Sequence, residues 1–223
     1  ELESKHIINN ELRNGMIIKL AEQHAGEGTV LISVNKIKHG KLLHELIKGS
    51  DKPTTAGYAE SYACGEHVRP AIPTGLQADS LKQEESKNPD NKFNKLLYQS
   101  EYLDGKSKTE PRRDILERFR TGEVKILVTT LLKEGADIPA LQTIINAGGG
   151  AGGRSDPMDN KSGKLVIQRA GRALRASDGK TKGRVIDFID KNVKMLQKHS
   201  NERKKTYESA GFKVNKIKKE EQK

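Results

Sequence analysis

Short apolar runs alternate with helical patterns along the first part of the chain. Apolar residues at helical spacing over residues 7–24 predict a first helix, and TVLISV (29–34) predicts a strand. HGKLLHELI (39–47) then predicts a second helix, and EYLDG (101–105) a short strand. Alternation of this kind is typical of a parallel sheet covered by helices, so we expect an α/β fold.

The pattern continues toward the C-terminus with one more helix and three more strands. Thr109 is the expected cap of the helix, with Pro111 in its first turn and Gly122 as its end. The predicted strands are VKILVT (124–129), QTIINA (142–147) and RVIDFI (184–189). Because these runs are apolar almost throughout, we expect them in a sheet that is buried on both faces.

Two segments depart from this pattern. Residues 49–98 carry six cations and seven anions, are rich in polar residues and show little periodicity, which predicts an insertion that is largely loop. Residues 191–223 carry eleven Lys and Arg against four Glu, and we interpret them as a basic extension of a domain spanning 1–190. VKMLQ, Tyr207, Phe212 and Val214 predict that part of the extension packs as a helix and a short extended piece. Its remaining charges can be a solvated tail or a phosphate-binding segment.

Composition restricts the class of protein. The 223 residues are 33% hydrophobic, which is enough for one domain with a core, and the net charge of +11 favours a polyanionic partner. The densest apolar stretch, residues 124–137, is interrupted by charged residues, so we expect no membrane span. Cys64 is the single cysteine, which predicts neither a disulfide nor a zinc site. We therefore expect a cytoplasmic or nucleoid-associated protein that is not secreted.

The octapeptide QRAGRALR (168–175) contains three arginines and no carboxylate. On a helix, Gln168, Arg172 and Arg175 fall within a wedge of roughly 60°, whereas apolar residues such as Ile167 occupy the other side. The planar fork of a guanidinium suits phosphate oxygens, so this face predicts a phosphate-binding group. An ordinary exposed basic helix face is the alternative.

Four segments together resemble the motifs of superfamily 2 helicases. VTTLLKEGADIP (128–139) and QRAGRALR resemble motifs V and VI, and VLISVNKIKHG (30–40) resembles the motif IV region. YLDGKSKTEPRRDILERFRTGEVKILV (102–128) is similar to the segment that leads into motif V. The resemblance implies the C-terminal RecA-like domain of a helicase or translocase. A Gln at the head of motif VI is more like the DNA repair, branch-migration and restriction branch than the DEAD-box RNA helicases, which favours DNA over RNA.

The resemblance also implies roles for individual residues at the nucleotide. Arg172 and Arg175 match arginine fingers, which reach the γ-phosphate of ATP held by an N-terminal RecA-like partner domain, and Gln168 matches the residue beside them. Gly135 and Asp137 match residues near the ribose and the coupling between the two sites. Asp137 can equally cap the turn before a proline.

A second set of residues matches positions that touch nucleic acid. Thr129 corresponds to the motif V residue at the nucleic-acid backbone. The motif IV region and the start of the third predicted helix add six candidates for phosphate contact, for each of which a solvated turn is the alternative: Asn35, Lys36, Lys38, His39, Arg112 and Arg113.

The sequence contains no Walker A motif. Gly105-Lys106-Ser107 has Ser100 where the first glycine is required, Gly179-Lys180-Thr181 has Leu174 there, and no acidic pair follows a strand. We therefore expect ATP and Mg²⁺ to be held mainly by a partner domain outside this chain, and the chain, which begins at Glu1, to be an inactive fragment of a longer enzyme. The alternative is a nucleic-acid-binding module without ATPase activity.

Overall fold

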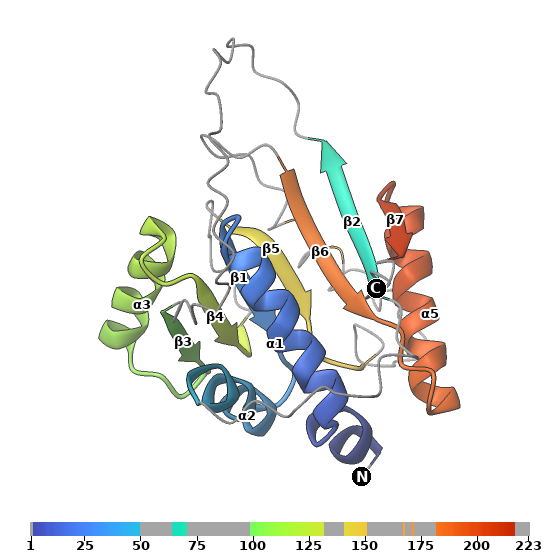
Figure 1. Cartoon of the computed structure of the whole chain (residues 1–223), viewed down its shortest axis with the longest axis horizontal. Coiled ribbons are helices and arrows are strands. Elements are labelled where there is room, and N and C mark those ends of the chain that lie inside the picture. The colour runs from blue at the N-terminus through green and yellow to red at the C-terminus, as the bar shows by residue number, and fades with distance from the viewer. Residues whose placement is uncertain are drawn as a thin grey trace, which may run out of the picture.

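The computed structural model describes residues 2–49, 64–70, 99–131, 141–150, 167, 171 and 182–216. Their strands form one seven-stranded sheet in the order β3-β4-β1-β5-β6-β2-β7 (Figure 1). The strands are β1 (Thr29–Ser33), β2 (Cys64–Pro70), β3 (Ser100–Leu103), β4 (Ile126–Thr129), β5 (Leu141–Asn146), β6 (Lys182–Phe188) and β7 (Lys213–Lys216).

Five adjacent strands form the parallel part of this sheet. β4 pairs with β3 and β1, β1 pairs with β5, and β5 pairs with β6, all in parallel. Every residue of β1 and β4 is buried. This confirms the expectation of a parallel sheet buried on both faces, since strands covered by helices on each side need apolar residues at both alternating positions.

Helices cover the two faces of the sheet and enclose two cores. One core includes α1 (Glu11–Ala25) and α2 (Ile37–Lys48) packed on side chains such as Ile32 and Val128. The other includes Phe119 of α3 (Thr109–Thr121) and Tyr207 of α5 (Lys194–Ser209), packed on the opposite face. In Figure 1, α1 crosses in front of the sheet, and α3 and α5 flank its two sides.

Two predicted helix starts differ from the structure. The expected helix at 7–24 is divided into a π-helical turn, η1 (Ser4–Ile8), and α1, because the side chain of Asn10 caps α1 by accepting a hydrogen bond from the Arg13 amide. Thr109 is the first residue of α3 rather than its cap, which is Lys108. The predicted end is correct, since Gly122 adopts a left-handed conformation with φ of 80°.

The insertion at 49–98 contributes a strand that its weak periodicity did not predict. β2 lies between β6 and β7 and is antiparallel to both. The sequence of this strand, CGEHVRP, has little strand propensity, and its conformation is set by backbone pairing on two sides. The rest of the insertion lies outside the described residues.

The C-terminal extension packs on the sheet as its apolar residues predicted. Tyr207 of α5 and Phe212, which follows the helix, are buried in the second core with their rings 5.9 Å apart. β7 then pairs with β2. Residues up to Lys216 are therefore part of the folded unit, and the final charge run lies outside the described residues.

Candidate nucleic-acid interface

Most residues predicted at nucleic acid lie where three adjacent strands end. Asn35 follows β1, Thr129 ends β4, and α3 begins shortly after β3. We call this region the basic edge and define it by Asn35, Lys36, Lys38, Arg112, Arg113 and Thr129. Because ligands of open α/β sheets bind outside the carboxyl ends of the strands, the topology brings these side chains to the expected position for a binding site.

The start of α2 supplies the exposed part of the basic edge. Asn35, Lys36 and Lys38 are all exposed. Lys36 is the N-cap, and no side chain caps this end of the helix. The first amides of a helix have no partner within the helix, so this end can donate hydrogen bonds to an anion and adds the positive end of the helix dipole.

His39 does not belong to this exposed surface. It is 1% exposed, and its Nε2 lies 2.9 Å from Oδ1 of Asn14 in α1. Burial, with a contribution from the positive charge of Arg13, lowers the pKa of His39 to about 3, so the imidazole is neutral at neutral pH. The structure therefore disagrees with its predicted phosphate contact, because helical periodicity turns this position of α2 toward α1.

Thr129 is buried as well and has a local partner. Its Oγ1 accepts a hydrogen bond of 2.9 Å from the Leu131 amide. The hydroxyl therefore holds the turn that follows β4, at the start of the motif V segment. In this conformation Thr129 stabilises the backbone turn next to the exposed residues of the basic edge, and its hydroxyl does not face solvent.

The turn between β3 and α3 is organised by Asp104, which was not among the predicted site residues. Asp104 accepts hydrogen bonds from the Lys106 amide at 2.8 Å and the Tyr102 hydroxyl at 3.1 Å. Burial would raise the pKa of this carboxyl, but these donors and the Ser107 hydroxyl outweigh it, so the pKa is lowered. The sequence DGKS (104–107) is a recognisable turn signal, because an aspartate can accept hydrogen bonds from the backbone that follows it.

The first turns of α3 bring two arginines to the same edge. Arg113 is exposed, whereas Arg112 is partly buried. Their contact with nucleic acid stays a prediction, and the structure places both on the helix that begins beside Asp104.

The predicted nucleotide-side residues lie outside the described residues: Gly135, Asp137, Gln168, Arg172 and Arg175. Two neighbours in the motif VI segment are described. Ile167 is helical and packs on the second core, while Gly171 is helical and exposed, and a Cβ added there would meet no atom within 4 Å. The packing of Ile167 agrees with its predicted place among the apolar residues of this segment.

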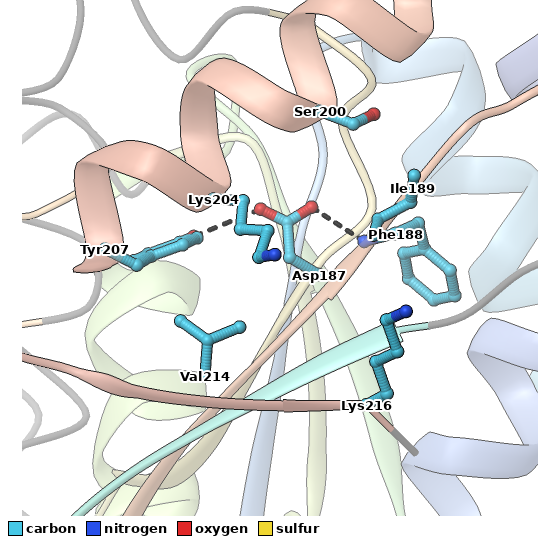
Figure 2. Close-up of a pocket in the computed structure, with 8 residues that line it drawn as sticks. All are labelled: Asp187, Phe188, Ile189, Ser200, Lys204, Tyr207, Val214 and Lys216. Carbon is cyan, nitrogen blue, oxygen red and sulfur yellow. Dashed lines mark hydrogen bonds between the residues drawn. The ribbon is translucent and has the colours of Figure 1, made fainter. Parts of the chain in front are cut away.

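The carboxyl ends of β5 and β6 differ from the basic edge, because their charges are buried in pairs. We call this region the paired edge and define it by Arg13, Asp187, Asp190, Arg203 and residues 147–150. Asp187 receives two bonds of 2.9 Å from Arg203, one each from Nε and Nη2. It also accepts from Asn146, Tyr207 and the Phe188 amide, the last two drawn in Figure 2. Burial would raise the pKa of Asp187, but Arg203 and the other donors outweigh it and lower the pKa, so the carboxyl is ionised.

A second buried pair joins α1 to the loop after β6. Arg13 donates from Nε to Asp190 at 2.9 Å and from Nη1 to the Ala147 carbonyl at 2.7 Å. Its guanidinium also lies 4.7 Å from the centroid of the Phe188 ring. Arg203 bonds the Gly150 carbonyl in the same way. The two arginines therefore hold the first turn of the glycine-rich loop from two different helices.

Close packing explains two glycines of that turn. A Cβ on Gly148 would lie 2.5 Å from Nδ2 of Asn35, and a Cβ on Gly149 would lie 2.4 Å from Cδ1 of Ile7. The turn is thus pressed between the start of α2 and the N-terminal turn η1. This contact connects the paired edge to Asn35 of the basic edge.

A row of buried polar residues also links the two edges. Thr129, Ser33, Asn146 and Asp187 lie in register across β4, β1, β5 and β6, on the face of the second core. The sequence carried a signal for this row, because β1, β4 and β5 each change from apolar to polar at their last residue. A lone Asp within RVIDFI is a further signal, since buried carboxylates require partners.

Among the described residues, no group of His, Cys, Asp and Glu is arranged to hold a metal ion. In the same part of the chain, no helix has the length and apolar character needed to cross a membrane.

Known proteins resemble this chain in sequence and in fold. Residues 79–177 match the helicase conserved C-terminal domain. The UvrABC system protein B of Chlorobium limicola is 35% identical over 108 residues, which cover 45% of this chain and 14% of that protein. The curated relatives match this chain over less than a fifth of their own length.

Solved structures extend the likeness to nearly the whole chain. The C-terminal domain of the DEAD-box protein Dbp5 superposes with a TM-score of 0.53 at 18% identity, covering 92% of this chain and 81% of that one. The UvsW protein of T4 gives a TM-score of 0.52 at 18% identity, covering 93% of this chain and 34% of that one. Residues 79–177 thus resemble the helicase conserved C-terminal domain in sequence, and the chain has a fold like that of solved helicase C-terminal domains.

Proposed function

We propose that the chain is the second motor domain of an ATP-dependent nucleic-acid helicase or translocase. The observation that carries this proposal is the gathering of Asn35, Lys36, Lys38 and Arg113 at one edge of a helicase-type sheet. These residues come from two helix starts that are far apart in the sequence. Their exposure at the strand ends supports a surface that holds the backbone of a nucleic-acid strand by its phosphates.

The nucleotide side of the proposal rests on the motif VI segment. Arg172 and Arg175 supply guanidinium groups to the γ-phosphate of ATP at the interface with an N-terminal RecA-like domain, where they stabilise the charge that develops during phosphoryl transfer. Gln168, Gly135 and Asp137 line the nucleotide from this side. ATP and Mg²⁺ are held mainly by the partner domain, so the enzyme is an ATP hydrolase only when both domains are present.

DNA is the proposed nucleic acid. The Gln at the head of motif VI supports this choice, because it resembles the DNA repair, branch-migration and restriction branch of superfamily 2. A solved yeast Dbp5 structure is bound to RNA and ADP BeF3, at 17% identity to this chain, so RNA is the competitor to test. We place the protein in the cytoplasm or on the nucleoid.

A nucleic-acid-binding module without ATPase activity is the second candidate. The basic edge favours it equally, because phosphate contacts from exposed lysines need no nucleotide. The two candidates differ in what Arg172 and Arg175 do.

The test is made in the protein that joins this chain to its nucleotide-holding domain. Arg172→Ala or Arg175→Ala should lower ATP turnover by about 10³ to 10⁵, as for arginine fingers in related phosphoryl transfer, with nucleic-acid affinity nearly intact. Arg172→Lys or Arg175→Lys should lower ATP turnover as well, because the single ammonium of lysine does not reproduce the planar, forked hydrogen bonding of a guanidinium. Arg120→Ala is the matched control, since Arg120 is exposed on α3 and pairs only with Glu117 among the described residues.

Two results would contradict the motor proposal. Weaker nucleic-acid binding with unchanged hydrolysis in the Arg172 or Arg175 variants would favour the binding module. Robust ATP turnover by the 223-residue chain alone would show that the chain holds the triphosphate without a partner domain.

A further inference from the structure

α5 has one buried face and one exposed lysine face. Its buried side chains are Leu196, Ser200, Arg203 and Tyr207. Lys194, Lys198 and Lys205 are exposed and fall within about 40° of one another around the helix, roughly opposite Arg203. We call these three residues the lysine stripe. Lys191, also exposed, directly precedes the helix and extends the stripe at its N-terminal end.

Among the residues that the structure describes, no ion pair neutralises the charges of the lysine stripe. Within the described part of the chain, none of its three ammonium groups forms a salt bridge, whereas Lys204 on the flank of α5 pairs with Glu208 at 3.5 Å. Glu202 is exposed one turn from Lys198 and Lys205 but takes part in no described ion pair. The stripe therefore offers a row of uncompensated positive charge to solvent.

α3, which packs on the same face toward the opposite edge of the sheet, gives a useful contrast. Arg118 pairs with Glu123 at 2.8 Å and Glu101 at 3.2 Å, and Arg120 pairs with Glu117 at 3.1 Å. The surface cations toward the end of α3 are thus used within the protein. Among the described residues, those of the lysine stripe form no such ion pair.

The stripe begins at the paired edge, which the glycine turn joins to Asn35 of the basic edge. Lys191 follows Asp190, whose carboxylate is bonded to Arg13 and lies 3.6 Å from a Cβ position on Gly149. The neighbouring glycine, Gly148, is in close contact with Asn35. α5 starts just past the arrowhead end of β6 (Figure 1). A strand of nucleic acid that extends from Asn35 across this glycine turn would reach Lys191 and then the stripe.

The buried face of α5 fixes the direction in which the stripe points. Arg203 is 1% exposed and bonds Asp187 through two nitrogens, and Tyr207 bonds the same carboxylate (Figure 2). Ser200 donates to the Leu196 carbonyl and accepts from the Asp190 amide. Rotation of α5 would break these bonds inside the core, so the lysine face is held outward before any ligand binds.

We propose that the lysine stripe of α5 binds the phosphate backbone of the nucleic acid where it extends past the basic edge. Lys194 and Lys205 are eleven residues apart, which is about 16 Å along a helix and matches roughly five phosphates of one strand. This inference rests on the proposed function, since it extends the same nucleic-acid path. It assigns to the C-terminal extension a role in holding long substrates.

The experiment compares two triple variants of the chain on duplex DNA of two lengths. Lys194→Gln, Lys198→Gln and Lys205→Gln together should make the fall of log affinity with log salt less steep, by up to about 2.7, on a long duplex. On a duplex of about one helical turn, ~10 base pairs, the slope should not change, because such a duplex is filled by the basic edge. The control variant carries Lys19→Gln, Lys48→Gln and Lys125→Gln, which remove the same charge away from this path, and should behave as the unsubstituted chain.

The outcomes separate this inference from the proposed function. If the stripe variant and the unsubstituted chain have the same slope on the long duplex, the stripe contacts solvent only and the inference is wrong. A third variant with Lys36→Gln and Lys38→Gln tests the basic edge alone. Unchanged affinity of that variant for the short duplex overturns the basic edge as the site, whatever the stripe does. A chain that binds neither duplex overturns both proposals.

Discussion

The basic edge and the paired edge end the same parallel sheet, but they use positive charge in opposite ways. At the basic edge, Lys36, Lys38 and Arg113 are exposed. At the paired edge, Arg13 and Arg203 are 3% and 1% exposed, and each bonds one aspartate and one carbonyl of the glycine-rich turn. One edge is open to an outside anion, and the other has already satisfied its cations with anions of its own.

The difference shows that a count of basic residues does not locate a nucleic-acid site. A buried guanidinium must be matched by a carboxylate, because the desolvation cost of an unpaired charge is several kcal/mol. An exposed lysine loses little by remaining without a partner, so it stays available for a phosphate. Burial, rather than residue type, divides the cations of this domain into structural and binding groups.

The strongest test of the paired edge is Arg203→Met. Removing the guanidinium leaves the ionised carboxylate of Asp187 buried without its main partner, and we expect the free energy of unfolding to fall by about 3 to 5 kcal/mol. Urea denaturation would measure this loss. Adding Asp187→Asn should recover part of it, because the uncompensated charge is then gone.

The matched substitution at the basic edge is Arg113→Met, which should change the free energy of unfolding by less than about 0.5 kcal/mol. Equal losses from Arg203→Met and Arg113→Met would mean that the two edges do not differ as described.

A smaller effect is expected from His39, which lies beneath the basic edge and near Arg13. Its pKa is lowered to about 3 in the folded protein from 6.5, so the unfolded chain binds more protons between these values. Stability should therefore be fully present above pH 6.5 and fall on acidification, by up to about 1.4 kcal/mol for each pH unit. Unfolding curves at about pH 7 and about pH 5, on either side of the ordinary histidine pKa, would measure the fall.

His39→Gln should reduce this pH dependence, because a glutamine can donate to Asn14 without titrating. The pKa of His44 is also lowered by burial, so part of the dependence should persist until His44→Gln is added. Protonation of carboxyls with lowered pKa values, such as Asp104, changes the stability mainly below about pH 4. It therefore does not affect the comparison of unfolding at about pH 7 and about pH 5. An unchanged slope in the double variant would show that neither imidazole is held neutral by burial.

The smallest effect on stability is expected from Lys36→Gln and Lys38→Gln. Both side chains are exposed, so the free energy of unfolding should stay within about 0.5 kcal/mol of the original value. The salt dependence of duplex binding should still become shallower, by about 0.9 for each phosphate that the substituted side chains no longer neutralise. A clear loss of stability with an unchanged salt slope would assign these lysines to structure and remove the contrast between the edges.

Much of the fold could be predicted from local patterns. Each of the five parallel strands was predicted within a few residues, because buried strands need continuous apolar runs. Gly122 was predicted to end α3, because a left-handed residue commonly closes a helix. β2 could not be predicted, since its conformation depends on two neighbours that are distant in the sequence.

The candidate site was predictable in position but not in every side chain. The motif IV region placed Asn35, Lys36 and Lys38 at a strand end, and the structure has them exposed there. His39 directly follows Lys38 in the first turn of α2, yet it is buried against Asn14. A run of polar residues at the start of a helix does not reveal which of them faces the core until the packing of another helix is known.

By itself, the sequence determined the order of the five parallel strands and the helices around them, the excess of positive charge and the resemblance to helicase motifs, since these depend on local composition and spacing. Only the tertiary structure decided which charges are available. Arg203 belongs to a run of three cations, Arg203, Lys204 and Lys205, yet it is buried on Asp187, while Lys205 faces solvent. Arg13 meets Asp190 across 177 residues of chain. Such pairs form because buried charges must find partners wherever the fold brings them, and sequence spacing carries no record of that distance.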